Sequence, residues 1–73
     1  MSDLVRCTAG WQYPERPTEV LWEAEWLRVE SVIKQWHEPS GYYYWVICDN
    51  EYHFELFYNV HNENWYIRLL MGS

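Results

Sequence analysis

The sequence predicts an all-β fold, a small and strongly bent antiparallel meander or partly open barrel of four to five strands. Short segments rich in aromatic and β-branched residues recur along the 73-residue chain, and turn-forming residues separate them. Several segments alternate between apolar and polar residues, as a strand with one buried face does. In addition, 21% of the residues are aromatic, and such rings are enriched in strands.

The first part of the chain is expected to form a strand and then an aromatic loop. The apolar residues around Val5 predict a first strand over Asp3–Thr8. Pro14 and Pro17 exclude a helix interior, because each fixes its own backbone and restricts the preceding residue. The segment Trp11–Pro17 is therefore predicted to be a loop held by its aromatic side chains.

We expect one domain over residues 1–73, in which residues 1–17 hold the N-terminal strand and loop and residues 18–70 form the meander. Two β-type runs, Glu19–Trp22 and Trp26–Val29, flank Glu23-Ala24. This gap suits a two-residue hairpin, although the usual Asn-Gly or Asp-Gly signal is absent.

Residues 29–36 can be interpreted in two ways. Val29, Val32, Ile33 and Trp36 follow the i, i+3, i+4, i+7 spacing of a helix, so a short helical turn is one prediction. The β-branched residues and the missing cap favour a bent strand, with a bulge near Glu30-Ser31 that shifts its faces by one residue. We favour the bent strand, but propensity does not decide between the two.

The second half of the chain contains the clearest strands and turns. The predicted strands are Tyr42–Cys48, Tyr52–Asn59 and Trp65–Leu70. The predicted loops and turns are His37–Gly41, Asp49–Glu51 and His61–Asn64. In the second of these strands, one face should carry Tyr52, Phe54, Leu56 and Tyr58.

The run Tyr42-Tyr43-Tyr44-Trp45 places large rings on both faces of its strand. Tyr42 and Tyr44 continue into Val46 and Cys48, so their face is the better candidate for the core. Tyr43 and Trp45 point the other way and need a different cover.

If the strands are neighbours, the outward rings form one patch, and Trp and Tyr dominate binding hot spots. The candidate patch consists of Tyr43, Trp45, Phe57 and Tyr66. One alternative is that Trp11 and Tyr13 fold back to cover these rings. Others are a protein partner or homodimer, or single-stranded nucleic acid whose bases stack on the rings.

The charge balance disfavours nucleic acid as a partner. The chain has 11 Asp and Glu residues against 5 Lys and Arg, a net charge of −6, and its basic residues are scattered. Clustered positive charge is what binds phosphates, so this acidic domain could more easily meet a basic partner surface, or its charge could simply keep it soluble.

The start of the chain lacks a signal-peptide pattern, and no apolar run approaches the roughly 20 residues that span a membrane. We therefore expect a cytoplasmic protein without a membrane role. Its thiols, Cys7 and Cys48, are then reduced, each acting as a small buried hydrophobe. A disulfide bridge between them would be possible if they lie close together. The aromatic strand should raise the pKa of Cys48.

No catalytic motif is present, and we expect no enzyme, cofactor or metal site. His37, His53 and His61 are too far apart for a local zinc motif, so ordinary exposed histidines are favoured. Glu23 and Glu25 could share a face for acid–base chemistry, but solvated surface charge is the simpler interpretation. No small-molecule substrate is evident, because so small a domain is expected to lack a typical pocket of about 300 Å³.

The spacing of the large residues resembles a family of small bacterial β-rich domains of unknown function. The similarity covers roughly Trp11 to Leu70. It rests on Trp22, then Val29, Val32 and Trp36-His37-Glu38, then the aromatic strand, Phe54-Glu55-Leu56, and finally Trp65 and Ile67. The entry segment, residues 13–17, is also similar.

Two departures from the family pattern stand out. Glu23-Ala24 replaces a glycine-containing turn, and His37 stands where a basic residue is usual. Some members of the family are associated with Y-family DNA-repair polymerases, so the resemblance implies an accessory interaction module. It supplies no functional residues to carry over.

These observations predict a small non-enzymatic protein-interaction module of unknown partner that uses an exposed aromatic patch. The alternatives are an accessory module for single-stranded nucleic acid and a self-associating structural protein.

Overall fold

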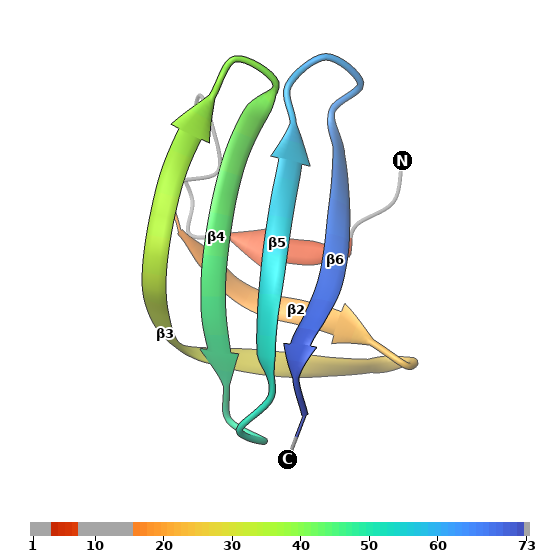
Figure 1. The fold of residues 1–73 in the computed structure, drawn as a ribbon. Helices are drawn as coiled ribbons and strands as arrows, with labels where there is room; N and C mark the ends of the chain where they lie inside the picture. Colours follow the sequence, from red (N-terminus) through yellow and green to blue (C-terminus); the bar gives the residue numbers. More distant parts are fainter. Residues whose placement is uncertain (1–3, 8–15, 73) are drawn as a thin grey trace.

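The chain forms one antiparallel sheet whose six strands follow each other in sequence order (Figure 1). This is a computed structural model, and it describes residues 4–7 and 16–72. The strands are β1 (Val5–Cys7), β2 (Pro17–Trp22), β3 (Glu25–Glu38), β4 (Gly41–Cys48), β5 (His53–Asn59) and β6 (Asn64–Met71). The predicted all-β, strongly bent architecture is confirmed as a curled half-barrel, with slightly more strands than expected.

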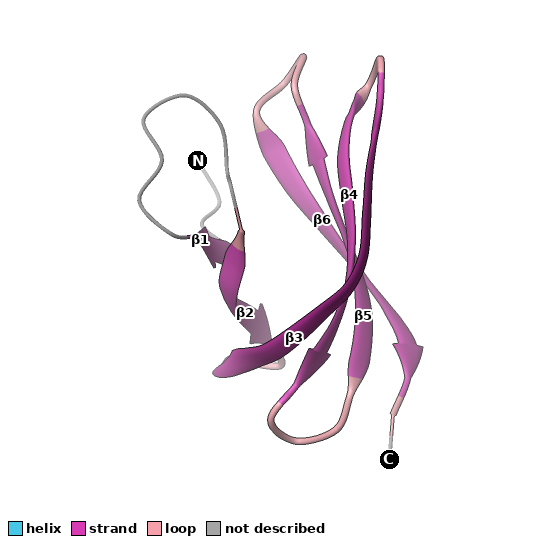
Figure 2. Ribbon diagram, turned by 90° about the vertical axis from the view of Figure 1, so that its left-hand side faces the viewer, coloured by secondary structure: helices cyan, strands magenta, loops and turns pink. Residues whose placement is uncertain are grey.

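The bend lies in β3, which pairs with a different neighbour along each half. Residues 25–28 of β3 pair with β2, and residues 29–38 pair with β4. Figure 2 shows the consequence: β1 and β2 lie across one face of the sheet formed by β4, β5 and β6. That face is the inner face, and the opposite one is called the outer face below.

Residues 29–36 are strand, so the predicted alternative of a short helical turn is wrong. The bulge expected near Glu30-Ser31 is present, because the register shifts between Val29 and Ser31. A second shift lies between Val32 and Lys34. Each bulge adds one residue to the two-residue period of a strand, so inner-face residues recur every three positions. This explains why a strand imitates helical spacing.

The β2–β3 hairpin confirms the predicted two-residue turn. Trp22 pairs with Glu25, and Glu23 and Ala24 have φ values of 50° and 68°. Positive φ at both central residues is the geometry of a type I′ turn, which matches the twist of the strands. The turn contains no glycine or asparagine. Glu23 and Ala24 are both exposed, and both adopt the left-handed backbone.

Two predicted loops end differently from the expectation. The predicted loop His37–Gly41 is wrong at its ends, because Glu38 already pairs with Gly41 and only Pro39-Ser40 connect β3 to β4. Pro17 opens β2 and is buried rather than closing a loop. The first strand is found over Val5–Cys7, while most of the expected aromatic loop lies outside the described residues.

The core lies between the inner face of β4–β6 and the crossing strands β1 and β2. Its buried hydrophobic residues are Val5, Val20, Tyr44, Val46, Cys48, Phe54, Leu56 and Trp65. Tyr42 is half-buried and packs against this cluster. The predicted core face of β4 is therefore confirmed, and so is the predicted alternation of β5. No helix in the described residues is long and apolar enough to cross a membrane.

Candidate functional site

A row of four aromatic rings crosses the outer face, with one ring from each of four neighbouring strands. Strand pairing sets Trp36 of β3 opposite Tyr43 of β4, Tyr43 opposite Phe57 of β5, and Phe57 opposite Tyr66 of β6. We call these four residues the aromatic ladder. Their common face follows from period-two alternation, and the tight turns fix their register.

The ladder rings are stacked on one another rather than laid flat on the sheet. The ring centroids of Trp36 and Tyr43 are 4.9 Å apart with planes 4° from parallel, and those of Tyr43 and Phe57 are 4.4 Å apart at 20°. Phe57 and Tyr66 continue the stack at 5.9 Å and 25°. Since Tyr43 and Phe57 each stack on two neighbours, and Trp36 and Tyr66 on one, the middle of the ladder presents ring edges outward rather than ring faces.

Gly41 lies at the turn end of the ladder and makes its packing possible. It has a φ of 155°, and a Cβ added there would lie 1.9 Å from the carbonyl oxygen of Tyr58 and 2.9 Å from Cε1 of Phe57. Any side chain at position 41 would therefore clash with the ring of Phe57.

A second row of residues, parallel to the ladder, combines charge with the ring of Trp45. Pairing places Lys34, Trp45, Glu55 and Arg68 side by side on the outer face. The indole Nε1 of Trp45 donates a 2.9 Å hydrogen bond to Oε1 of Glu55, and Arg68 donates one of 3.0 Å to the same oxygen. The Nζ of Lys34 lies 5.1 Å from the ring centroids of both Trp36 and Trp45, within cation–π range.

The carboxyl of Glu55 joins this row electrostatically. Burial alone would raise its pKa, but the hydrogen bonds from Trp45 and Arg68, together with the charge of Arg68, hold the pKa below its ordinary value. Glu55 is therefore a fixed carboxylate at neutral pH. It anchors the indole of Trp45, whose ring meets Trp36 edge to face at 5.6 Å.

Polar residues also hold both ends of the ladder. The indole Nε1 of Trp36 donates to Oε2 of Glu38 at 3.1 Å, and Nδ2 of Asn62 donates to the hydroxyl of Tyr66 at 2.9 Å. The rings are thus fixed by stacking and by hydrogen bonds, and a partner would find them already ordered.

The four patch residues named from the sequence all come to the outer face, and three of them are in the ladder. Trp45 belongs to the second row and reaches the ladder through Trp36. Tyr66 is 48% exposed, whereas Tyr43, Trp45 and Phe57 are partly buried by their neighbours. None of the described strands lies over this face (Figure 2). Trp11 and Tyr13, the proposed internal cover, fall outside the described residues.

Trp36 was missed as a patch residue, because its helical spacing with Val29 and Val32 grouped it with the core. The two bulges of β3 separate it from them and turn it outward. A two-residue turn at Pro39-Ser40 was the signal that could have found it. With Glu38 opposite Gly41, counting back two residues sets Trp36 opposite Tyr43.

The other candidate groups do not converge. His37 lies in β3, His53 in β5 and His61 in the turn after β5, and the described residues contain no group of three or more His, Cys, Asp or Glu side chains that could hold a metal ion. Glu23 and Glu25 are exposed at the β2–β3 hairpin. Cys7 and Cys48 are both free thiols.

Burial raises the pKa of each thiol to about 11, with the charge of Asp49 adding to the effect at Cys48. The predicted direction for Cys48 is therefore confirmed. A raised pKa leaves little thiolate at neutral pH, so neither cysteine has the properties of a nucleophile.

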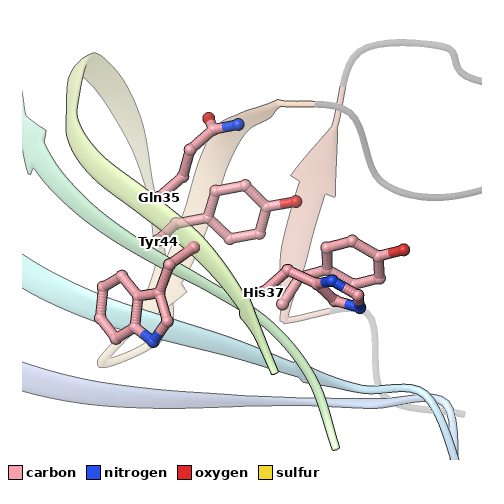
Figure 3. Close-up of a pocket in the computed structure, with 5 residues that line it drawn as sticks. Gln35, His37 and Tyr44 are labelled. Carbon is pink, nitrogen blue, oxygen red and sulfur yellow. The ribbon is translucent and has the colours of Figure 1, made fainter. Parts of the chain in front are cut away.

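The described side chains line several hollows, and the first of these borders the ladder at Trp36. One of about 160 Å³ is lined by Gln35, Trp36, His37, Tyr42 and Tyr44, and Figure 3 shows several of these side chains around it. In this hollow the imidazole of His37 and the ring of Tyr42 are stacked, with centroids 4.8 Å apart. It is smaller than typical ligand pockets, which start at about 300 Å³.

Another hollow lies at the first bulge of β3 and has a volume of about 310 Å³. Its lining residues are Arg28, Val29, Glu30 and Asp49. The expectation that no hollow reaches 300 Å³ is therefore wrong, since a bulge and a neighbouring turn together leave this space. Val29 is the one apolar residue in its lining, whereas ligand pockets are mostly apolar.

Comparisons with protein-family models, with curated proteins and with solved structures find no match. The site must therefore be interpreted from its own geometry.

Proposed function

We propose that this protein is a small non-enzymatic interaction module that binds another protein through the aromatic ladder and Trp45. The observation that carries the proposal is the continuous stack of four rings on a sheet face over which no described strand lies. Tyr and Trp supply large contact area with few rotatable bonds, and they dominate binding hot spots. Hydrogen bonds from Trp36, Trp45 and Asn62 fix the rings in advance, which lowers the ordering cost of binding.

The proposed occupant is a basic protein surface with an apolar centre. The apolar centre follows from the ring edges that the ladder presents. The basic character follows from the net charge of −6, and from the fact that Arg6 and Arg68 are already in ion pairs at 3.0 Å while Lys34 lies over two indoles. Electrostatic attraction of this kind speeds association and weakens as salt is added.

The stacked geometry argues against the alternative of nucleic-acid binding. Base stacking needs a free ring face, but Tyr43 and Phe57 already use both faces on their neighbours, so only the end rings Trp36 and Tyr66 keep a face that is not stacked within the ladder. The bound phosphates would also meet an acidic protein. A module of the accessory type remains compatible with the resemblance noted from the sequence.

The experiment is a selection from a displayed library of random peptides, followed by titration of selected peptides against purified variants. We expect wild type to enrich peptides with apolar and basic residues, and Tyr43→Ser to weaken their binding at least tenfold. Trp26→Ser is the matched control, because Trp26 is a partly buried aromatic residue in the half of β3 that pairs with β2, where Arg6 lies 3.9 Å from the centroid of its ring. Circular dichroism checks that both variants are folded.

Two outcomes would overturn the proposal. One is equal binding of the selected peptides to wild type and folded Tyr43→Ser. The other is tight binding of a labelled single-stranded oligonucleotide at low salt that Tyr43→Ser abolishes, since this would transfer the ladder to the nucleic-acid alternative.

A further inference from the structure

The last strand, β6, forms an edge of the sheet. Among the described strands it pairs with β5 alone, so the backbone groups along its other side have no strand partner. The strand is eight residues long, Asn64–Met71, and contains no proline. Such an edge is a template for another strand, and natural sheets usually protect it with charges, proline or a very short strand.

The exposed apolar side chains of the described residues are concentrated on this same strand. Tyr66 is 48% exposed, Leu69 and Leu70 are each 39% exposed, and Met71 is 61% exposed, while Ile33 is the one large exposed hydrophobic residue elsewhere. The single charge of β6 belongs to Arg68, which turns back to Glu55 at 3.0 Å. The edge is therefore apolar and lacks the usual protection.

We propose that β6 is a dimerisation edge, at which two copies of this chain pair antiparallel about a two-fold axis at Ile67. Pairing about this residue sets Tyr66 opposite Arg68 of the second copy, and Trp65 opposite Leu69 of the second copy. A two-fold axis makes each of these contacts twice, as a symmetric dimer requires. The strand is complementary to itself: cation next to ring, and apolar next to apolar.

The dimer extends the outer face instead of covering it. Because paired residues in adjacent strands share a face, the outer faces of the two copies form one continuous surface. The dimer therefore leaves the outer faces uncovered, although Tyr66, the last ring of the ladder, also lies at the paired edge.

The charge of the chain gives the dimer a distinctive salt dependence. Each copy carries a net charge of −6, so two copies repel each other, while β6 itself contains no carboxylate. Added salt screens this repulsion between exposed charges that lie farther apart than the Debye length, which is about 8 Å at physiological ionic strength. Dimerisation should therefore strengthen with salt, the opposite of binding to a basic partner.

Sedimentation equilibrium of the full chain over a range of protein and salt concentrations tests the inference. We expect a monomer–dimer equilibrium whose dissociation constant falls as salt rises. Leu70→Lys should raise this constant at least tenfold, because it places a charge on each side of the paired edge. Ile33→Lys is the matched control, since Ile33 is also an exposed apolar residue but lies at a bulge of β3; it should leave the constant within twofold.

A spin label tests the register. In Met71→Cys, labelled at the exposed new thiol, the two labelled positions lie eight residues apart along the paired strands, or about 26 Å at 3.3 Å per residue. The raised pKa values of Cys7 and Cys48, about 11, favour labelling of the new cysteine. Strictly monomeric wild type would overturn the inference. So would a dimer that Leu70→Lys leaves intact and Tyr43→Ser dissociates, since that dimer would use the ladder.

Discussion

The contact between Tyr43 and Phe57 can be measured as a coupling free energy. In the structure Tyr43 stacks on Trp36 and on Phe57, and Phe57 stacks on Tyr43 and on Tyr66. An aromatic pair contributes about 0.5–1.5 kcal/mol beyond burial, so we take about 1 kcal/mol for each contact. Tyr43→Ala and Phe57→Ala then each lose two contacts, or about 2 kcal/mol of pair energy.

The double variant loses three contacts rather than four, because the two single variants share one of them. Its pair-energy loss is therefore about 3 kcal/mol, and the expected coupling is about 1 kcal/mol. A domain of this length has an unfolding free energy on the order of 4–11 kcal/mol, at about 0.05–0.15 kcal/mol per residue, so the pair-energy loss alone does not unfold the double variant. Loss of buried area adds to each single value but cancels from the coupling when it is additive.

Urea unfolding followed by far-ultraviolet circular dichroism gives the four free energies of the cycle. Trp36→Ala and Tyr66→Ala form the matched control cycle, because these rings stand at opposite ends of the ladder, on β3 and β6. Their effects should add to within about 0.5 kcal/mol. A Tyr43–Phe57 coupling no larger than that of the control cycle would show that the stack is absent in solution, and it would remove the basis for a preformed ladder.

Three further predictions concern single sites. Gly41→Ala should destabilise the fold by about 2–5 kcal/mol in urea unfolding, through backbone strain and the close approach to Tyr58 and Phe57, and a loss under about 0.5 kcal/mol would contradict the packing at Gly41. Burial raises the pKa values of Cys7 and Cys48 from 9.0 to about 11, so the contribution of these thiols to the free energy of unfolding should be fully present below pH 9.0 and should be lost as the pH rises toward 11. The native thiols should also react with iodoacetamide far more slowly than the thiols of the urea-unfolded chain, and equal rates would contradict their burial. The folded state lowers the pKa of Glu55 below its ordinary value of 4.5, so the ionised carboxylate stabilises the fold above pH 4.5, and this contribution is lost as the pH falls through the lower folded pKa. The thermal unfolding temperature of E55Q should therefore depend less on acid than that of wild type. An acid profile identical to that of wild type would contradict the lowered pKa of Glu55.

The strands of the second half could be predicted because their sequence follows a single period. Phe54 and Leu56 alternate with Glu55 and Phe57, and each lies on the predicted face. The same rule separated Tyr44 from Tyr43 and placed the outward rings on one side of the sheet. A strand period is a local property, and local properties are available from one sequence.

The phase of β3 could not be obtained in this way. Two bulges within five residues make its inner positions recur at Val29, Val32 and Gln35, a spacing that a helix shares. One bulge was foreseen from this ambiguity, but a bulge at Ile33 carries no signal in the sequence. The sequence therefore grouped Trp36 with the core, whereas the structure places it on the outer face as the first ring of the ladder.

The crossing of β1 and β2 over the inner face was also beyond the sequence. It depends on a bend within β3 and on pairing between distant segments, such as Val5 with Val20. Once made, this crossing decides what the two aromatic faces of β4 are for. Val5 and Val20 join the core around Tyr44 and Val46, so Tyr44 is buried and Tyr42 packs against the core. The outer rings satisfy one another sideways through stacking, yet their edges still face outward. A ladder of this kind is stable without a partner and remains available to one, so it can contribute to folding and to binding at the same time. That is why the peptide-binding assay should also include Tyr43→Ala, so that the coupling between Tyr43 and Phe57 and the binding defect are measured in one variant.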